Sequence, residues 1–180
     1  LSFRTEKLKV DFGEINAIRR IIEHLKDEGC KCANLDGFFY AFKIPQIGKE
    51  FDLLRIDKET VLNIEIKSQS VSQEAILSQL KKNKYYLSSL NKVLKFYTYD
   101  YEWDILYCMT ENKELKTCTF SDLYKSMCQQ TEIYDGDISS LFKPSDYLIS
   151  PLNTPEKFLN NEYFLTGHQE EIKNWLYSFV

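Results

Sequence analysis

Two apolar stretches that carry charged residues decide the fold. Residues 50–57 read Glu-Phe-Asp-Leu-Leu-Arg-Ile-Asp and, after a short polar turn, residues 61–67 read Val-Leu-Asn-Ile-Glu-Ile-Lys. This composition predicts two neighbouring antiparallel strands joined by a hairpin. An apolar strand seldom carries charges unless they are paired, solvated or functional. Asp52, Glu65 and Lys67 therefore mark a candidate site.

The segments around the hairpin predict one α/β domain. Helices are predicted from apolar residues at helical spacing, and strands from aromatic and β-branched runs between turn residues. We expect Ser121 to cap the last helix. The predicted order is a helix over 14–26, strands over 37–43, 49–56 and 61–68, a helix over 72–90, strands over 92–98 and 103–109, and a helix over 120–130. This order predicts a three-layer sandwich with a mixed central sheet flanked by helices. We expect the domain to span residues 1–143, followed by an extension over 144–180.

Composition limits the classes of function. The chain has 180 residues, a net charge of −4 and five cysteines, an odd number that argues against a disulfide framework. No apolar run approaches the ~20 residues that span a bilayer, and no signal-peptide core begins the chain. We therefore expect a cytoplasmic protein whose cysteines are mostly small core residues. Cys30 and Cys32 lack the Cys-x-x-Cys spacing of a metal site, and His24 and His168 have no obvious partners.

The two-residue period of strands sorts the charged side chains. Asn63, Glu65 and Lys67 share one face of their strand. If the two strands pair, Asp52 lies beside Glu65. Mg²⁺ is typically held by one or two carboxylates and keeps several waters, so Asp52 and Glu65 could bind it, with the carbonyl of Ile66 as a third contact. Lys67 could then orient or deprotonate an attacking water.

The spacing of Glu65 and Lys67 carries little information by itself. An acidic residue two positions before a lysine occurs four times, at 65/67, 111/113, 114/116 and 171/173. The first copy differs because it lies in an apolar strand with an aspartate on the strand before it. The alternative for Asp52, Glu65 and Lys67 is a solvent-facing salt bridge across two strands.

The pattern resembles the PD-(D/E)XK nuclease superfamily, of restriction-endonuclease-like fold. The resemblance covers about residues 11–109 and rests on Asp52, Glu65, Ile66 and Lys67. It implies that Asp52 and Glu65 bind Mg²⁺ or Mn²⁺ and that Lys67 is catalytic. It also implies that Glu14, which opens the first helix, belongs to the metal site. It further implies that Gln79, in the next helix, is a site residue.

Two features fit this resemblance less closely. Phe51 stands where relatives often have a proline before the aspartate. Glu14 can equally be a favourable charge in the first turn of a helix, and Gln79 an ordinary surface amide.

The carboxyl-terminal segment carries a further resemblance. Leu165-Thr166 followed by Gln169 resembles the entry to helicase-type ATPase domains, in which such a glutamine contacts adenine. This resemblance implies that the chain is the nuclease domain of a larger nuclease–helicase protein. Because no phosphate-binding glycine loop follows, we do not expect these residues to bind ATP as a P-loop enzyme does. The alternative is a terminal helix capped by Thr166.

The sequence therefore predicts a Mg²⁺- or Mn²⁺-dependent nuclease that hydrolyses phosphodiester bonds, with DNA as the expected partner. The negative net charge is unusual for such a protein. Lys81, Lys82, Lys84, Lys92 and Lys95 form the best basic cluster, although a solvated helix face explains them equally. The alternative function is a catalytically inactive nuclease-like module that binds nucleic acid or docks a protein.

Overall fold

The computed structural model describes residues 12–147, 156, 159, 172 and 175–178. In chain order the elements are α1 (Phe12–Asp27), η1 (Cys32–Leu35), β1 (Phe38–Lys43), β2 (Glu50–Ile56), β3 (Thr60–Lys67), α2 (Gln73–Leu87), η2 (Ser88–Leu90), β4 (Val93–Asp100), β5 (Ile105–Met109), β6 (Leu115–Cys118), α3 (Phe120–Cys128), η3 (Ile138–Leu141) and η4 (Pro144–Tyr147). The predicted order of helices and strands is confirmed, with one further strand, β6.

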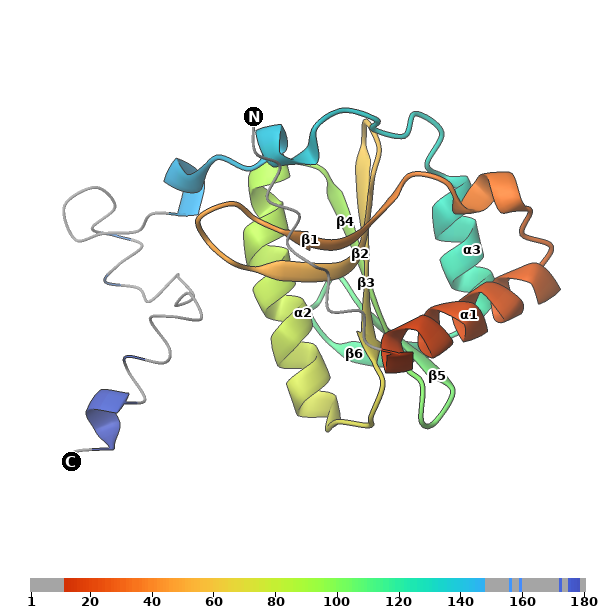
Figure 1. The fold of residues 1–180 in the computed structure, drawn as a ribbon, viewed down its shortest axis with the longest axis horizontal. Helices are drawn as coiled ribbons and strands as arrows, with labels where there is room; N and C mark the ends of the chain where they lie inside the picture. The colour runs from red at the N-terminus through yellow and green to blue at the C-terminus, as the bar shows by residue number, and fades with distance from the viewer. Residues whose placement is uncertain (1–11, 148–155, 157–158, 160–171, 173–174, 179–180) are drawn as a thin grey trace.

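The strands form one mixed sheet in the order β1-β2-β3-β4-β5-β6. Neighbouring strands are antiparallel except β3 and β4, which run parallel. The parallel pair follows from the crossover, because α2 carries the chain back along the sheet before β4 begins (Figure 1). β3 is therefore a central strand, paired on both sides.

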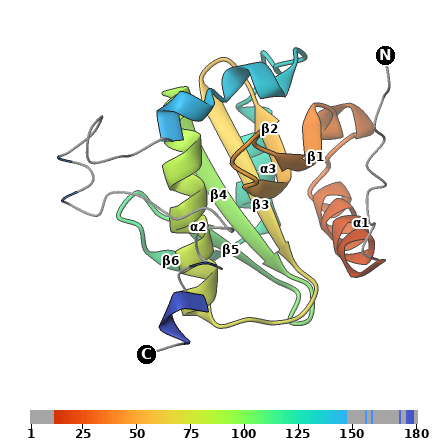
Figure 2. The ribbon, with the colours of Figure 1, turned by 60° about the vertical axis from the view of Figure 1, so that its left-hand side comes forward.

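Helices cover both faces of this sheet, so the domain has three layers (Figure 2). On one face Leu80 of α2 packs in a cluster with Leu54 of β2. On the other face Ala17 of α1 and Leu123 of α3 pack with Ile64 of β3. Val61 of β3 belongs to the first cluster and Leu62 to the second, as expected for a strand that is buried on both faces. The predicted α/β sandwich is confirmed at this level.

Two local predictions were wrong. The cap of α3 is Thr119, whose hydroxyl accepts the Asp122 amide, while Asp122 reciprocates by accepting the Thr119 amide. This capping box starts α3 earlier than a cap at Ser121 would. Strand β6 was not predicted because Lys116 and Thr117 are exposed, so this edge strand lacks the apolar alternation on which the prediction relied.

The cysteines differ from the expectation that most of them are small core residues. All five cysteines are free thiols, but only Cys30 is buried. Tyr147 packs on α2, where its hydroxyl lies 2.7 Å from the Ser89 hydroxyl and 3.0 Å from the Tyr86 carbonyl. Among the described residues, no helix has the length and apolarity needed to cross a membrane. The predicted helicase-like residues 165–169 lie outside the described residues.

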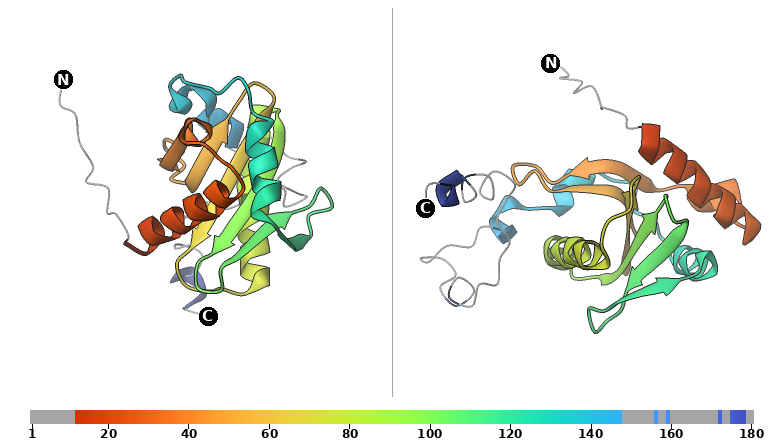
Figure 3. Two further views of the ribbon diagram at one scale, coloured as in Figure 1. Left: turned by 90° about the vertical axis from the view of Figure 1, so that its right-hand side faces the viewer. Right: turned by 90° about the horizontal axis from the view of Figure 1, so that it is seen from below.

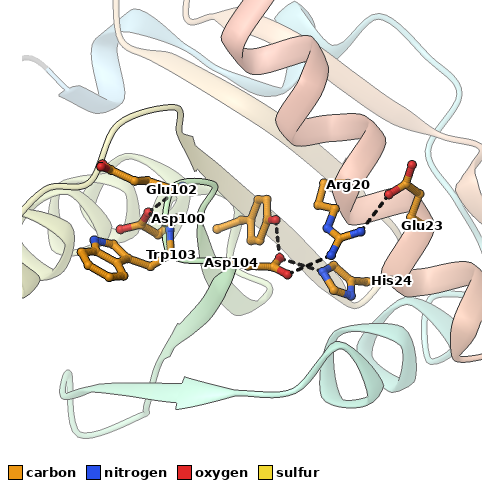
Figure 4. Close-up of polar contacts among 8 residues, drawn as sticks. Arg20, Glu23, His24, Asp100, Glu102, Trp103 and Asp104 are labelled. Carbon is orange, nitrogen blue, oxygen red and sulfur yellow. Dashed lines mark hydrogen bonds and ion pairs between the residues drawn. The ribbon is translucent and has the colours of Figure 1, made fainter.

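Asp104, in the β4–β5 turn, ties α1 to the sheet (Figure 4). Its carboxylate lies 2.7 Å from His24 Nε2 and 3.2 Å from Arg20 Nη2, and accepts the Tyr99 hydroxyl at 2.6 Å. The ring of His24 also stacks on Phe120, with centroids 4.1 Å apart. His24 thus has partners that the sequence did not reveal, and its contacts join α1 to the β4–β5 turn and to α3.

We expect Asp104→Asn to destabilise the domain by about 1 kcal/mol at pH 7, because charge-assisted hydrogen bonds are lost at a partly exposed position. Asparagine tolerates the left-handed backbone of this residue, whose φ is 52°, so the change tests the charge. Burial raises the pKa of Asp104, but hydrogen bonds from Tyr99 and His24 outweigh it and hold the pKa below its usual value. The stabilisation is therefore present above pH ~4 and is lost as pH falls through the folded-state pKa.

Urea unfolding at pH 7 and pH 3 measures this effect. Glu23→Gln is the control, because Glu23 forms an ion pair with the same Arg20 within α1 and is exposed. An Asp104→Asn protein as stable as Glu23→Gln at pH 7 would contradict the anchoring role.

Candidate active site

Asp52 lies where β2 and β3 separate. The paired residues of the two strands end at Leu53 and Ile64, and the same register places Asp52 opposite Glu65. The backbone amide of Ile66 donates to Asp52 Oδ2, at 2.8 Å, rather than to a backbone carbonyl of β2. The side chain of Asp52 thus takes the place of a backbone acceptor between the two strands, and this hydrogen bond holds the side chain in position. The sequence prediction that Asp52 lies beside Glu65 agrees with this register.

The pairing on the other side of Asp52 is interrupted as well. The register of β1 and β2 would place Ala41 opposite Asp52. The strands pair on either side of this position, but these two residues are not paired. Ala41 has a φ of 50°, a left-handed conformation that is unfavourable for alanine. Strained backbone often occurs at functional sites.

Glu65 is buried and surrounded by amide donors. Its side chain belongs to a residue only 2% exposed. Asn83 Nδ2 donates to Glu65 Oε1 at 2.7 Å and Asn63 Nδ2 donates at 3.3 Å, while Gln79 Nε2 reaches Oε2 at 3.3 Å. Buried charges need such partners. Gln79, predicted as a site residue, therefore contacts Glu65, and the three amides fix the orientation of this carboxylate.

The polar layer between β3, β4 and α2 extends beyond Glu65. Asn83 also donates to Asn63 Oδ1 at 2.7 Å, so α2 and β3 are joined by side-chain amides in an otherwise apolar interface. Asn83 Oδ1 and the Thr98 hydroxyl are buried, with no hydrogen-bond partner among the described residues. Thr98 is the β4 residue paired with Glu65. Unsatisfied buried groups are costly, so this polar layer is maintained at the expense of stability.

The carboxylates line a pocket of about 320 Å³ that contains as many basic as acidic residues. Lys67 comes from β3, Lys82 from α2 and Lys49 from the connection between β1 and β2. Burial lowers the pKa of Lys49, although nearby Glu65 and Asp52 oppose this effect. The pocket is lined by Ile47, Gly48, Lys49, Glu50, Asp52, Glu65, Lys67, Gln79, Lys82 and Tyr86.

Asp52 has a strongly raised pKa. Burial, followed by the negative charge of Glu65, raises the pKa of Asp52 from 3.8 to about 7. The hydrogen bond from the Ile66 amide and the charge of Lys67 oppose that rise without cancelling it. Near pH 7 Asp52 is therefore partly protonated, and a cation beside it would favour its ionised form.

Glu14 and Ile66 are placed differently from the other predicted residues. Glu14 Oε2 accepts the Tyr40 hydroxyl at 2.8 Å, and Glu14 is close enough to contribute to the raised pKa of Asp52. It does not line the pocket. Ile66 contributes its amide to Asp52. The two carboxylates and Gln79 are thus brought together, while Glu14 stands beside them on α1.

Among the described residues, Asp52, Glu65 and Lys67 do not form the solvent-facing salt bridge that was the alternative prediction. Glu65 is buried, and neither carboxylate forms an ion pair with Lys67. The roles of Asn83 and Lys49 were not predicted from the sequence. Asn83 lies four residues after Gln79, a spacing that puts both on one side of a helix and could have suggested a shared role. Lys49 had no such signal, because its position depends on the conformation of a connecting segment.

The donor set fits Mg²⁺ or Mn²⁺. Two converging carboxylates match the one or two that Mg²⁺ usually takes from a protein. Burial and then the charge of Glu65 raise the pKa of Asp52, and a divalent cation between the two carboxylates would offset the part that is due to Glu65. Among the described residues, no group of three or more His, Cys, Asp or Glu side chains is arranged to hold a metal ion. Water and substrate oxygens would have to complete the coordination.

Comparison with known proteins returns no match among family models, curated proteins or solved structures. The geometry of the site therefore carries the functional inference.

We expect Asp52→Asn to stabilise the metal-free protein at pH 8. A raised pKa means that the folded state holds the Asp52 proton more tightly than the unfolded chain. The free energy of unfolding therefore falls as pH rises from about 4 to about 7 and is flat above. Asparagine does not ionise, so the variant lacks this fall and gains about 1 kcal/mol or more at pH 8, since each unit of pKa corresponds to ~1.4 kcal/mol.

Urea unfolding in EDTA at pH 4, 6 and 8 measures this difference. The exposed Asp135, changed to asparagine, is the matched control. Wild-type and Asp52→Asn proteins with the same pH profile would contradict the account of Asp52 as a buried, strained carboxyl group.

Proposed function

We propose that this domain is a divalent-metal-dependent nuclease of restriction-endonuclease-like fold that hydrolyses phosphodiester bonds in DNA. The supporting observation is the convergence of Asp52 and buried Glu65 in one pocket with Lys67. Two carboxylates and a lysine on the central strands of an α/β sandwich are the elements that the sequence resemblance implies.

The residues of the pocket divide into three roles. Asp52 and Glu65 would hold the cation, and their positions are set by the Ile66 amide and by Asn83. Lys67 lies on the Glu65 face of β3 and supplies positive charge beside the phosphate that is cleaved. Gln79 is a positioning residue, because it acts through Glu65. A bound Mg²⁺ lowers the pKa of a coordinated water and stabilises charge on the phosphoryl group.

The site explains how a chain with a net charge of −4 can bind a polyanion. Three lysines surround the pocket, although acidic residues exceed basic ones in the whole chain. These three lysines balance the three carboxylates that line the same pocket, so the pocket itself is not acidic as the whole chain is. Once a divalent cation is bound, the pocket as a whole becomes positive.

Cleavage of supercoiled plasmid, linear duplex and single-stranded DNA with Mg²⁺ or Mn²⁺ tests this proposal. We expect metal-dependent cleavage that falls at least ~100-fold in Asp52→Asn and in Lys67→Ala, since positioned acid–base and electrostatic groups contribute factors of this size. The matched control is Lys113→Ala, because Glu111 and Lys113 have the same spacing as Glu65 and Lys67 but are exposed.

Full activity is expected for the Lys113→Ala control. Cleavage that persists unchanged in both site variants would identify a contaminating nuclease and reject the proposal. Salt-sensitive DNA binding with no metal-dependent turnover would instead favour the inactive nucleic-acid-binding module.

A further inference from the structure

A lysine outside the predicted motif, Lys49, also lines the active-site pocket. It belongs to the connection between β1 and β2, which contributes Ile47, Gly48 and Lys49 to the pocket wall. The β1–β2 hairpin extends beyond the rest of the sheet on the side of α2 (Figure 3). Lys49 therefore reaches the pocket from a different element than Lys67 of β3 and Lys82 of α2.

The conformation of the β1–β2 connection fixes the backbone of Lys49. The amide of Ile44 donates to the Lys49 carbonyl at 2.8 Å, and the amide of Gly48 donates to the Ile44 carbonyl at 3.0 Å. Ile44 is buried in the same apolar cluster as Leu80 of α2. This tight turn is thus closed by hydrogen bonds and anchored in the core, so the position from which Lys49 projects is set by packing.

The side chain of Lys49 lies in the pocket without an ion pair. Its ammonium lies 4.7 Å from the centroid of the buried Phe51 ring and donates to the Glu50 carbonyl. Among the described residues, Lys49 forms no ion pair with a carboxylate, and the Glu50 side chain pairs instead with Lys43 at 3.0 Å. An ammonium has three N–H donors. The donors of Lys49 that Glu50 does not use are therefore available to a ligand.

Lys49 and Lys67 flank the two carboxylates at the same end of the β2–β3 hairpin. The register that places Asp52 opposite Glu65, when continued, places Glu50 opposite Lys67, and Lys49 immediately precedes Glu50. Burial lowers the pKa of Lys49, while the charges of Glu65 and Asp52 oppose this effect, so the ammonium lies near both carboxylates. A cation held between these carboxylates would therefore have a lysine from each side of the hairpin beside it.

We infer that Lys49 is a second catalytic lysine, whose ammonium binds a non-bridging oxygen of the scissile phosphate while Lys67 approaches the same phosphate from β3. This inference rests on the proposed function, because the ligand is the substrate of that site. A phosphodiester has two non-bridging oxygens, and positioned ammonium groups stabilise the charge that develops on them during cleavage. A purely structural Lys49 would need only its contacts with Phe51 and the Glu50 carbonyl.

Single-turnover cleavage and DNA binding together test the inference. Cleavage of a labelled duplex and a labelled single strand is followed in MgCl2 with the protein in saturating excess. Binding of the same DNA is measured by fluorescence anisotropy in CaCl2, from about 50 to about 200 mM NaCl. Lys49→Met keeps an unbranched side chain over Phe51 and removes the charge, and Lys49→Arg keeps the charge. The charge-matched control is Lys58→Met, an exposed residue at the other end of β2.

We expect the single-turnover rate to fall at least ~10-fold in Lys49→Met, because a positioned group that stabilises developing charge is lost. Lys49→Arg should recover part of this rate. The slope of log K against log salt should be smaller by up to ~0.9 in Lys49→Met, since one phosphate contact is lost. A purely structural role would leave that slope unchanged. Lys58→Met should match the wild type in both measurements, and thermal melts check that each protein is folded.

A folded Lys49→Met protein with the wild-type rate and salt slope would overturn the inference. A lower rate that arginine does not restore, with an unchanged slope, would show a structural role and overturn it as well. So would the expected losses in Lys82→Met without any in Lys49→Met, because they would assign the phosphate contact to α2.

These outcomes are separable from a failure of the proposed function. A wild type that cleaves DNA, with no effect of Lys49→Met, rejects only the role of Lys49. A wild type that binds DNA but never cleaves it, with a smaller slope in Lys49→Met, rejects the nuclease and supports the phosphate contact. A wild type that neither binds nor cleaves DNA rejects both.

Discussion

The hydrogen bond from the Ile66 amide to Asp52 is the interaction on which the candidate site depends. It forms where β2 and β3 stop pairing, so a side chain takes the place of a backbone carbonyl. The exchange holds Asp52 beside Glu65 in the interior of the sheet. Burial, together with repulsion from the Glu65 carboxylate, raises the pKa of Asp52 and so expresses the cost of this placement.

The rest of the fold supports this arrangement. α2 packs its apolar residues against one face of the sheet, but sends Asn83 and Gln79 to Glu65. β1 accepts a left-handed Ala41 opposite Asp52. Each of these features lowers stability compared with an apolar or regular alternative. Such local costs are typical of sites kept for chemistry rather than for folding.

The sequence predicted the parts of the site that depend on strand geometry. Alternation put Glu65 and Lys67 on one face, and a hairpin placed Asp52 beside them, so the two carboxylates could be located from pattern alone. Asn83 and Lys49 could not be located in this way. The role of Asn83 depends on how α2 sits on β3, and that of Lys49 on the conformation of the β1–β2 connection. Likewise, the exposed β6 gave no apolar signal, and the partners of His24 come from a turn distant in sequence.

The central claim is that Asp52 and Glu65 share one divalent cation. The most direct measurement is a crystal of the wild-type chain soaked in Mn²⁺, with data collected to record the anomalous signal of the metal. The account predicts an anomalous peak between the two carboxylates, within ~2.5 Å of an oxygen of each, that disappears in Asp52→Asn. A fully soaked crystal with no peak at that position, or with the same peak in the variant, would contradict it.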